Sequence, residues 1–140
     1  MSAFRRRRGF TLVELLLVMV ILAVLAAIVI PKFAGRSEES RITAAQTQIA
    51  QFGTMLDMYE TDNGSYPTTQ QGLYALREKP TTAPEPRKWN GPYIKGEVPA
   101  DPWGSEYVYR SPGTLNKDGY DLISIGPDQK EGTEDDIFNP

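Results

Sequence analysis

Residues 5–30 read RRRRGFTLVELLLVMVILAVLAAIVI, and this stretch decides the architecture of the chain. It consists of a basic block, Gly9, and an apolar run to Ile30 in which Glu14 is the one charged residue. As a helix, residues 10–30 would span about 30 Å, the thickness of a bilayer core. A carboxylate within hydrocarbon costs about 2.5–3.5 kcal/mol. A membrane segment of this kind must therefore find a partner for Glu14.

The basic block at Arg5–Arg8 predicts how this segment is oriented. Positive residues beside a membrane helix stay on the cytoplasmic side, so the residues after Ile30 lie on the far side. The whole chain carries 15 basic and 18 acidic residues, a net charge of −3. Because this N-terminal block is the one concentrated basic stretch, we expect no nucleic-acid partner.

The basic block and the apolar run are also compatible with three other interpretations of the N-terminus. A secretory signal peptide would be cut near Ala23–Ala27, but its apolar region runs only 7–15 residues. A twin-arginine signal fits Arg7–Leu12 loosely and meets the same objection of length. A plain single-pass anchor is compatible with the hydropathy but gives Glu14 no role.

The hexapeptide Gly9-Phe10-Thr11-Leu12-Val13-Glu14 follows a short basic leader and begins the apolar run. In this context it resembles the class III signal of type IV pilins and pseudopilins. The resemblance implies that a prepilin peptidase removes residues 1–9 and methylates the new amino group of Phe10. It also implies that Glu14 pairs with the N-terminal amine of a neighbouring subunit during assembly. Cleavage indeed creates a cation about one helical turn before Glu14, and such a pair sets register more than it adds stability.

The helical pattern continues beyond the apolar run. Pro31 predicts a kink or a locally unwound stretch at about residues 30–36, with simple helix termination as the alternative. Asn63-Gly64 is a stop signal, so the helix is expected to run from Phe10 to about residue 62. An apolar stripe at helical spacing predicts packing on the chain's own domain, with a coiled-coil partner as the alternative. The stripe consists of Ile42, Ala45, Ile49, Phe52, Leu56 and Tyr59.

The remaining residues predict a small globular domain with β-strands, called the head below. Together with the long helix, this places the chain in the α+β class. A long N-terminal helix, with a transmembrane first half at 10–30, would pack on a small antiparallel β-sheet. The domain expected beyond the membrane is 31–140. Its predicted parts are a short helix at about 69–77 capped by Thr68 or Thr69, an ordered proline-rich loop at 78–105, a β-hairpin at 106–125 with strands Glu106–Arg110 and Tyr120–Ile125, and a third strand near Ile137-Phe138.

The acidic loop between residues 126 and 137 holds five acids and a single lysine. A solvated acidic turn is one interpretation. A Ca²⁺ site is the other, because this ion takes six to eight oxygens from carboxylates and backbone carbonyls. The spacing is not that of an EF-hand.

Four short sequence motifs in the head narrow the resemblance to one class of pseudopilin. Tyr66–Leu73, Gly91–Tyr93, Asp101–Gly104 and Tyr120–Gly126 occur in the order found in the major pseudopilin of type II secretion systems. The fold this implies is pilin-like.

This resemblance implies a Ca²⁺ ion in the acidic loop. Glu131 and Glu134 match no ligand position and are expected to be solvated, whereas Pro127 and Gln129 replace small residues without removing a ligand. The implied ligands are the carboxylates of Asp128, Asp135 and Asp136 and the carbonyls of Ile125, Lys130 and Thr133.

The same resemblance implies a structural role in the bacterial inner membrane. The subunit would cross the membrane once, with a cytoplasmic N-terminus and a periplasmic head. It would polymerise into a periplasmic pseudopilus that drives folded proteins out through an outer-membrane channel. Its partners would be its own copies, minor pseudopilins, the inner-membrane assembly platform with the secretion ATPase, and the prepilin peptidase, with no small-molecule substrate.

Two alternatives to this role remain. One is a type IV pilin or competence pseudopilin, although the chain lacks the cysteine pair that often closes the C-terminal loop of adhesive pilins. The other is a membrane-anchored periplasmic enzyme that uses Asp121, Asp128, Asp135 and Asp136. The absence of histidine, cysteine and any nucleophile motif weighs against it, so we expect no enzyme.

Overall fold

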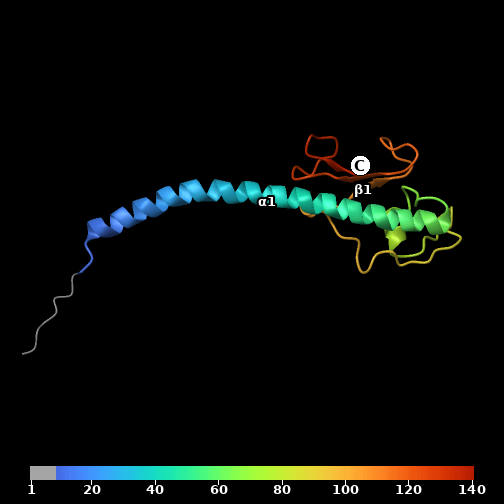
Figure 1. Ribbon diagram of the computed structural model, residues 1–140, viewed down its shortest axis with the longest axis horizontal. Coiled ribbons are helices and arrows are strands. Elements are labelled where there is room, and N and C mark those ends of the chain that lie inside the picture. Colours follow the sequence, from blue (N-terminus) through green and yellow to red (C-terminus); the bar gives the residue numbers. More distant parts are fainter. Residues whose placement is uncertain (1–8) are drawn as a thin grey trace, which may run out of the picture. The chain divides into compact units, whose positions relative to one another are not determined.

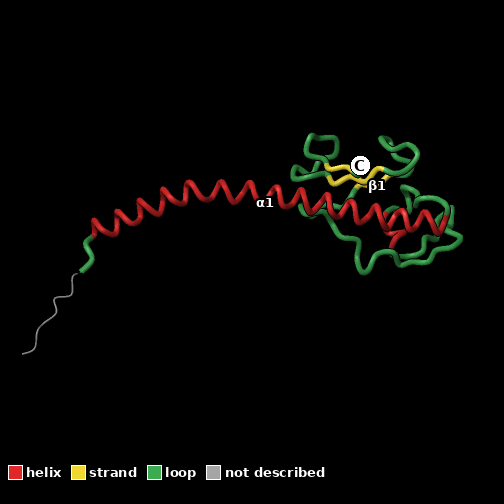
Figure 2. Tube along the Cα trace, in the orientation of Figure 1, coloured by secondary structure: helices red, strands yellow, loops and turns green. Residues whose placement is uncertain are grey.

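The computed structural model describes residues 9–140, except for the side chains of residues 29–36. After the long helix, most of the chain is loop, drawn green in Figure 2. A long helix followed by a small sheet confirms the predicted α+β class. The elements in chain order are α1 (Leu12–Asn63), the 3₁₀ helix η1 (Leu73–Leu76), β1 (Val108–Arg110), β2 (Asp121–Ser124) and β3 (Ile137–Phe138).

Helix α1 ends where the sequence predicts. Gly64 takes a left-handed φ of 81° directly after Asn63, and its N–H donates to the Glu60 carbonyl at 2.6 Å. This is the usual glycine stop of a helix. Helix α1 continues through residues 30–36, so the expected local unwinding and the alternative end at Pro31 are both wrong, whereas a kink there stays a prediction. A proline removes one backbone hydrogen bond, and the turns on either side can offset that loss.

The chain divides into two compact units, Met1–Glu39 and Ser40–Pro140. In the first unit, the large apolar side chains of residues 10–28 are 45–75% exposed. Among the residues that the structure describes, no helix is both long enough and apolar enough to cross a membrane.

The core of the second unit is built on the predicted stripe of α1. Ala45, Ile49, Phe52, Leu56 and Tyr59 are at most 2% exposed. Ile42 is the exception: it is 37% exposed, so its predicted burial is wrong. It lies in the first turn of this unit, before the buried part of the stripe begins at Ala45. The periodicity fixes the direction of the side chain but not how far the covering head extends.

The sheet and the loops that follow η1 lie on opposite sides of the second half of α1 (Figure 1). The sheet has the order β1-β2-β3 and is antiparallel throughout. In its register Val108 faces Ile123 across β1 and β2, and Ser124 faces Ile137 across β2 and β3. The hairpin is therefore present, with shorter strands than the sequence predicts.

Residues just before the sheet and in the proline-rich loop pack on the helix through aromatic contacts. The rings of Phe52 on α1 and Tyr107 just before β1 meet edge to face with centroids 5.3 Å apart. Tyr59 meets Tyr93 of the proline-rich loop in the same way at 5.7 Å. Such pairs add roughly 0.5–1.5 kcal/mol to the burial of the rings themselves.

The predicted helix at 69–77 is shortened to the 3₁₀ helix η1. Thr68 and Gln71 close a turn before it, since the Thr68 hydroxyl accepts the Gln71 N–H at 3.3 Å and the Gln71 side chain accepts the Thr68 N–H at 3.1 Å. Gly72 then takes a positive φ of 59°. This left-handed residue prevents the turn and η1 from joining into one helix.

The proline-rich loop at 78–105 is ordered by hydrogen bonds at its aromatic residues. The indole N–H of Trp89 donates to the Ala75 carbonyl at 2.9 Å, and the Tyr93 hydroxyl donates to the Asp62 carboxylate at 2.7 Å. The loop is thereby tied to η1 and to the end of α1, without regular structure of its own.

Candidate functional site

The start of α1 brings Glu14 to a helix N-terminus. Thr11 is the N-cap: its hydroxyl oxygen accepts the Glu14 N–H at 3.2 Å. Glu14 therefore sits in the first turn of α1, where the helix dipole favours an anion. The sequence Thr11-x-x-Glu14 is a capping-box signature, a local signal from which this cap is predictable. The helix N-terminus therefore stabilises the Glu14 carboxylate in part, even without the amine of a neighbouring subunit.

The residues around the predicted cleavage point are accessible. Gly9 is exposed and precedes the helix, and Phe10 is 75% exposed. The rest of the predicted leader, residues 1–8, lies outside the described residues. An apolar surface as long as that of residues 10–28 is not left in water by a soluble protein, and it needs lipid or other protein to cover it.

The acidic loop is a compact turn structure with three left-handed residues. The φ angles are 63° at Gly126, 56° at Gln129 and 90° at Gly132. A Cβ at position 126 would lie 2.6 Å from the Asp135 carbonyl oxygen and 2.8 Å from its carboxylate. Glycine at 126 therefore lets the two ends of the loop close on each other.

Asp128 and Asp135 are brought together around Thr133. The Thr133 hydroxyl lies 2.6 Å from Asp135 Oδ1 and 3.4 Å from Asp128 Oδ1, and the Asp128 N–H donates to Asp135 Oδ2 at 3.2 Å. The hydrogen bond from Thr133, followed by that from the Asp128 N–H, lowers the pKa of the Asp135 carboxyl. Both hydrogen bonds favour the ionised form of Asp135.

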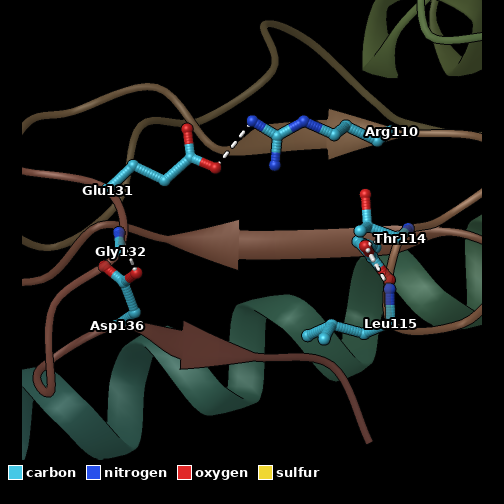
Figure 3. Close-up of polar contacts among 7 residues, drawn as sticks. Arg110, Thr114, Leu115, Glu131, Gly132 and Asp136 are labelled. Carbon is cyan, nitrogen blue, oxygen red and sulfur yellow. Dashed lines mark hydrogen bonds and ion pairs between the residues drawn. The ribbon is translucent and has the colours of Figure 1, made fainter.

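Asp136 is the third predicted carboxylate ligand. Its Oδ2 accepts the Gly132 N–H at 2.7 Å, a pair that faces across the loop in Figure 3. Its Oδ1 is buried and has no hydrogen-bond partner. A buried carboxylate oxygen without a donor costs free energy unless a cation or a water reaches it.

The three carboxylates do not form a ready-made metal centre. Across the described part of the chain, no group of three or more acidic side chains is arranged to hold a metal ion. Of the predicted carbonyl ligands, that of Lys130 lies 3.0 Å from the Thr133 hydroxyl oxygen and that of Thr133 lies 3.4 Å from the Asp136 nitrogen. Ile125 lies directly after β2, at the entrance of the loop.

The two glutamates of the loop differ from each other. Arg110 reaches from β1 to Glu131, with Nη2 and Oε1 2.6 Å apart (Figure 3). Glu131 is exposed, as expected of a solvated acid, and the sheet edge also places a cation beside it. Glu134 is exposed.

Asp121 lies apart from these carboxylates and has a different role. It is 1% exposed and accepts the backbone N–H groups of Thr114, Leu115 and Asn116 at 2.5–3.0 Å. Burial by itself would raise the pKa of this carboxyl, but the three N–H donors outweigh it and the pKa is lowered. Asp121 therefore holds the 113–119 turn and is not placed for acid–base chemistry.

Two profiles of known families match the chain. The profile described as type II secretion system protein G covers residues 32–140, and the prokaryotic N-terminal methylation motif covers residues 4–30. The first matches well over half of the chain, and it is a profile of type II secretion rather than of type IV pilins.

Relatives and a solved structure agree with these profiles. Type II secretion system core protein G of Pseudomonas aeruginosa is 47% identical over 131 residues, covering 94% of this chain and 91% of the relative. The protein of the same name from Escherichia coli K12 is 47% identical over 140 residues, covering 99% and 94%. The crystal structure of the major pseudopilin from the type 2 secretion system of enterohaemorrhagic Escherichia coli is 41% identical, with a TM-score of 0.67, and the match covers 76% of this chain and 91% of that one.

These matches decide between the alternatives that the sequence leaves open. A family of structural subunits excludes the enzyme interpretation, in agreement with the protected position of Asp121. With its methylation motif, its long helix and its three-stranded sheet, the chain belongs to the type II secretion system protein G family, that of the major pseudopilins.

Proposed function

We propose that this chain is the major structural subunit of a type II secretion pseudopilus. It polymerises from the inner membrane and drives folded periplasmic proteins across the outer membrane. The observation that carries this proposal is the apolar surface of residues 10–28, whose large apolar side chains are 45–75% exposed in one chain and which includes Glu14 near its start. Copies of the same helix, together with lipid, are the natural cover for such a surface.

The proposed placement follows from the same segment. Residues 10–30 lie in the inner membrane before assembly, with the basic leader in the cytoplasm and the head in the periplasm. The partners are further copies of the chain, minor pseudopilins, the inner-membrane assembly platform with its ATPase, and the prepilin peptidase. Once residues 1–9 are removed, the new amine at Phe10 and the helix N-terminus both act on Glu14.

Processing can be tested directly by mass spectrometry. We expect the protein from membranes of a strain with the prepilin peptidase to begin at N-methylated Phe10. The same protein from a strain without the peptidase should retain residues 1–9. A mature chain that begins elsewhere would overturn the proposed processing.

We further propose that the acidic loop binds Ca²⁺. The residues that would hold it are Asp128, Asp135 and Asp136 with the carbonyls of Ile125, Lys130 and Thr133. Three features support the fit: oxygen donors alone, a buried Asp136 oxygen without a partner, and a glycine at 126 that lets the loop close. Bound calcium would neutralise carboxylates that otherwise repel one another. Without calcium, N–H and hydroxyl groups of the loop donate hydrogen bonds to these carboxylates. Bound calcium would replace some of these hydrogen bonds.

Removal of calcium is expected to destabilise the head. For a Kd of about 10⁻⁴–10⁻³ M, about 1 mM Ca²⁺ stabilises the folded state by roughly 0.4–1.4 kcal/mol. A chelator should therefore lower the Tm of fragment 35–140, which contains the whole second unit. Asp128→Ala should abolish this response, whereas Glu134→Ala, an exposed acid of the same loop, should keep it. A melting curve that does not move with chelator would contradict the site.

A further inference from the structure

The turn at residues 101–105 encloses a buried carboxylate. Asp101 is 5% exposed. Its backbone N–H donates to the Ser105 carbonyl at 2.8 Å, and its carbonyl accepts the Gly104 N–H at 2.9 Å. Its Oδ1 accepts the N–H groups of Trp103 at 3.1 Å and Ser105 at 2.8 Å. Four hydrogen bonds thus close this short turn around the carboxylate and make it rigid.

The second oxygen of Asp101 reaches the end of strand β2. Asp101 Oδ2 accepts the hydroxyl of Ser124 at 2.7 Å, and Ser124 is 0% exposed. The same hydroxyl oxygen lies 3.5 Å from the Gly126 N–H. This chain of contacts holds the backbone on both sides of Ile125, the first of the proposed carbonyl ligands.

The turn contacts the acidic loop a second time. The side-chain amide of Gln129 donates to the Trp103 carbonyl at 3.2 Å. Gln129 has a left-handed φ of 56°, which is uncommon for a residue other than glycine. It directly precedes Lys130, the second proposed carbonyl ligand. One turn therefore fixes two separate points of the loop, at its entrance and at its middle.

We infer that Asp101 is a positioning residue for the cation site: it acts through Ser124 on Ile125, while its turn acts through Gln129 on Lys130. This inference rests on the proposed calcium site. A turn that sets these carbonyls before the ion arrives lowers the ordering cost of binding. Removing a residue that orients a metal ligand typically costs tenfold to a hundredfold in affinity.

The test is a calorimetric titration of Ca²⁺ into the full-length protein in detergent micelles. For Ser124→Ala, we expect the calcium Kd to rise by about tenfold to a hundredfold. The Gly126 amide should also exchange its hydrogen faster, because it loses its acceptor. The matched control is Thr69→Ala, which removes another hydroxyl that donates to the Ser111 carbonyl and accepts its N–H. It should lower the Tm and leave the calcium Kd unchanged.

The outcomes separate this inference from the calcium proposal. A wild-type protein that binds no calcium overturns both. A wild-type protein that binds, with the same Kd in Ser124→Ala or an equal loss in Thr69→Ala, overturns the positioning role alone. If Ser124→Ala does not fold, Gln129→Met decides, since methionine keeps the length of this exposed side chain and loses the amide that donates to Trp103. A raised Kd in that variant supports the inference, and an unchanged Kd overturns it.

Discussion

Glu14→Leu is expected to insert into the membrane and lose its leader normally but to form no pseudopili. Leucine removes the charge that the Phe10 amine of a neighbouring subunit would pair with, so the subunits lose the contact that sets their register. Insertion should improve if anything, because a carboxylate no longer enters hydrocarbon. The measurement is electron microscopy of sheared filaments from an assembly-reconstituted strain, with immunoblots that establish membrane insertion and mature size.

Two further variants separate charge from shape at this position. Glu14→Gln keeps the length of the side chain and should fail like leucine. Glu14→Asp keeps the charge and should retain part of the assembly. Filaments from Glu14→Leu at wild-type abundance would contradict the pairing, and failure of the leader to be cleaved would show that the defect lies before assembly.

Asp121→Asn is expected to destabilise the head by about 2–3 kcal/mol at neutral pH. Asparagine has nearly the same volume, but it replaces one carboxylate oxygen with an amide group that cannot accept. At least one of the three backbone N–H groups that now point at Asp121 then loses its acceptor in a buried place. Denaturant unfolding of fragment 35–140 measures this loss as a lower midpoint.

The effect should depend on pH with a defined sign. The folded state lowers the pKa of Asp121, so its contribution to stability is present above the unfolded value of about 3.9 and is lost as the pH falls through the folded value. The difference between wild type and Asp121→Asn should therefore be largest above about pH 4 and shrink in more acidic solution.

Asp118→Asn is the matched control, because Asp118 is an exposed acid in the same turn. It should change stability by about 0.5 kcal/mol or less. An equal loss in both variants, or a gap that widens in acid, would refute the role assigned to the Asp121 carboxylate.

Much of the fold is predictable because its signals are local. The spacing of Ala45, Ile49 and Phe52 is set by the geometry of one helix, and these residues are buried as expected. The Asn63-Gly64 stop, the hairpin and the short third strand follow likewise from neighbouring residues. The prediction fails where burial depends on residues far away in the sequence. Ile42 continues the apolar stripe of the helix, but the head does not extend far enough to cover it.

The acids of the head illustrate what local patterns leave open. Asp101, Asp121 and Asp128 look alike in a list of carboxylates, and the sequence places two of them, Asp121 and Asp128, in one hypothetical catalytic set. Folding buries Asp101 and Asp121 among backbone N–H groups and leaves Asp128 exposed in its loop. No composition or spacing rule predicts which backbone amides will gather around a given carboxylate.

By itself, the sequence determined the membrane-length apolar run, the position of Glu14 at its start, the buried stripe and the family. These depend on residues within a few positions of one another, where helix geometry and hydropathy act directly. Only the tertiary structure decided that Arg110 pairs with Glu131 and that Asp101 reaches Ser124. Such partners are chosen by packing, since the chain must close loops and bury the core before the two groups can meet.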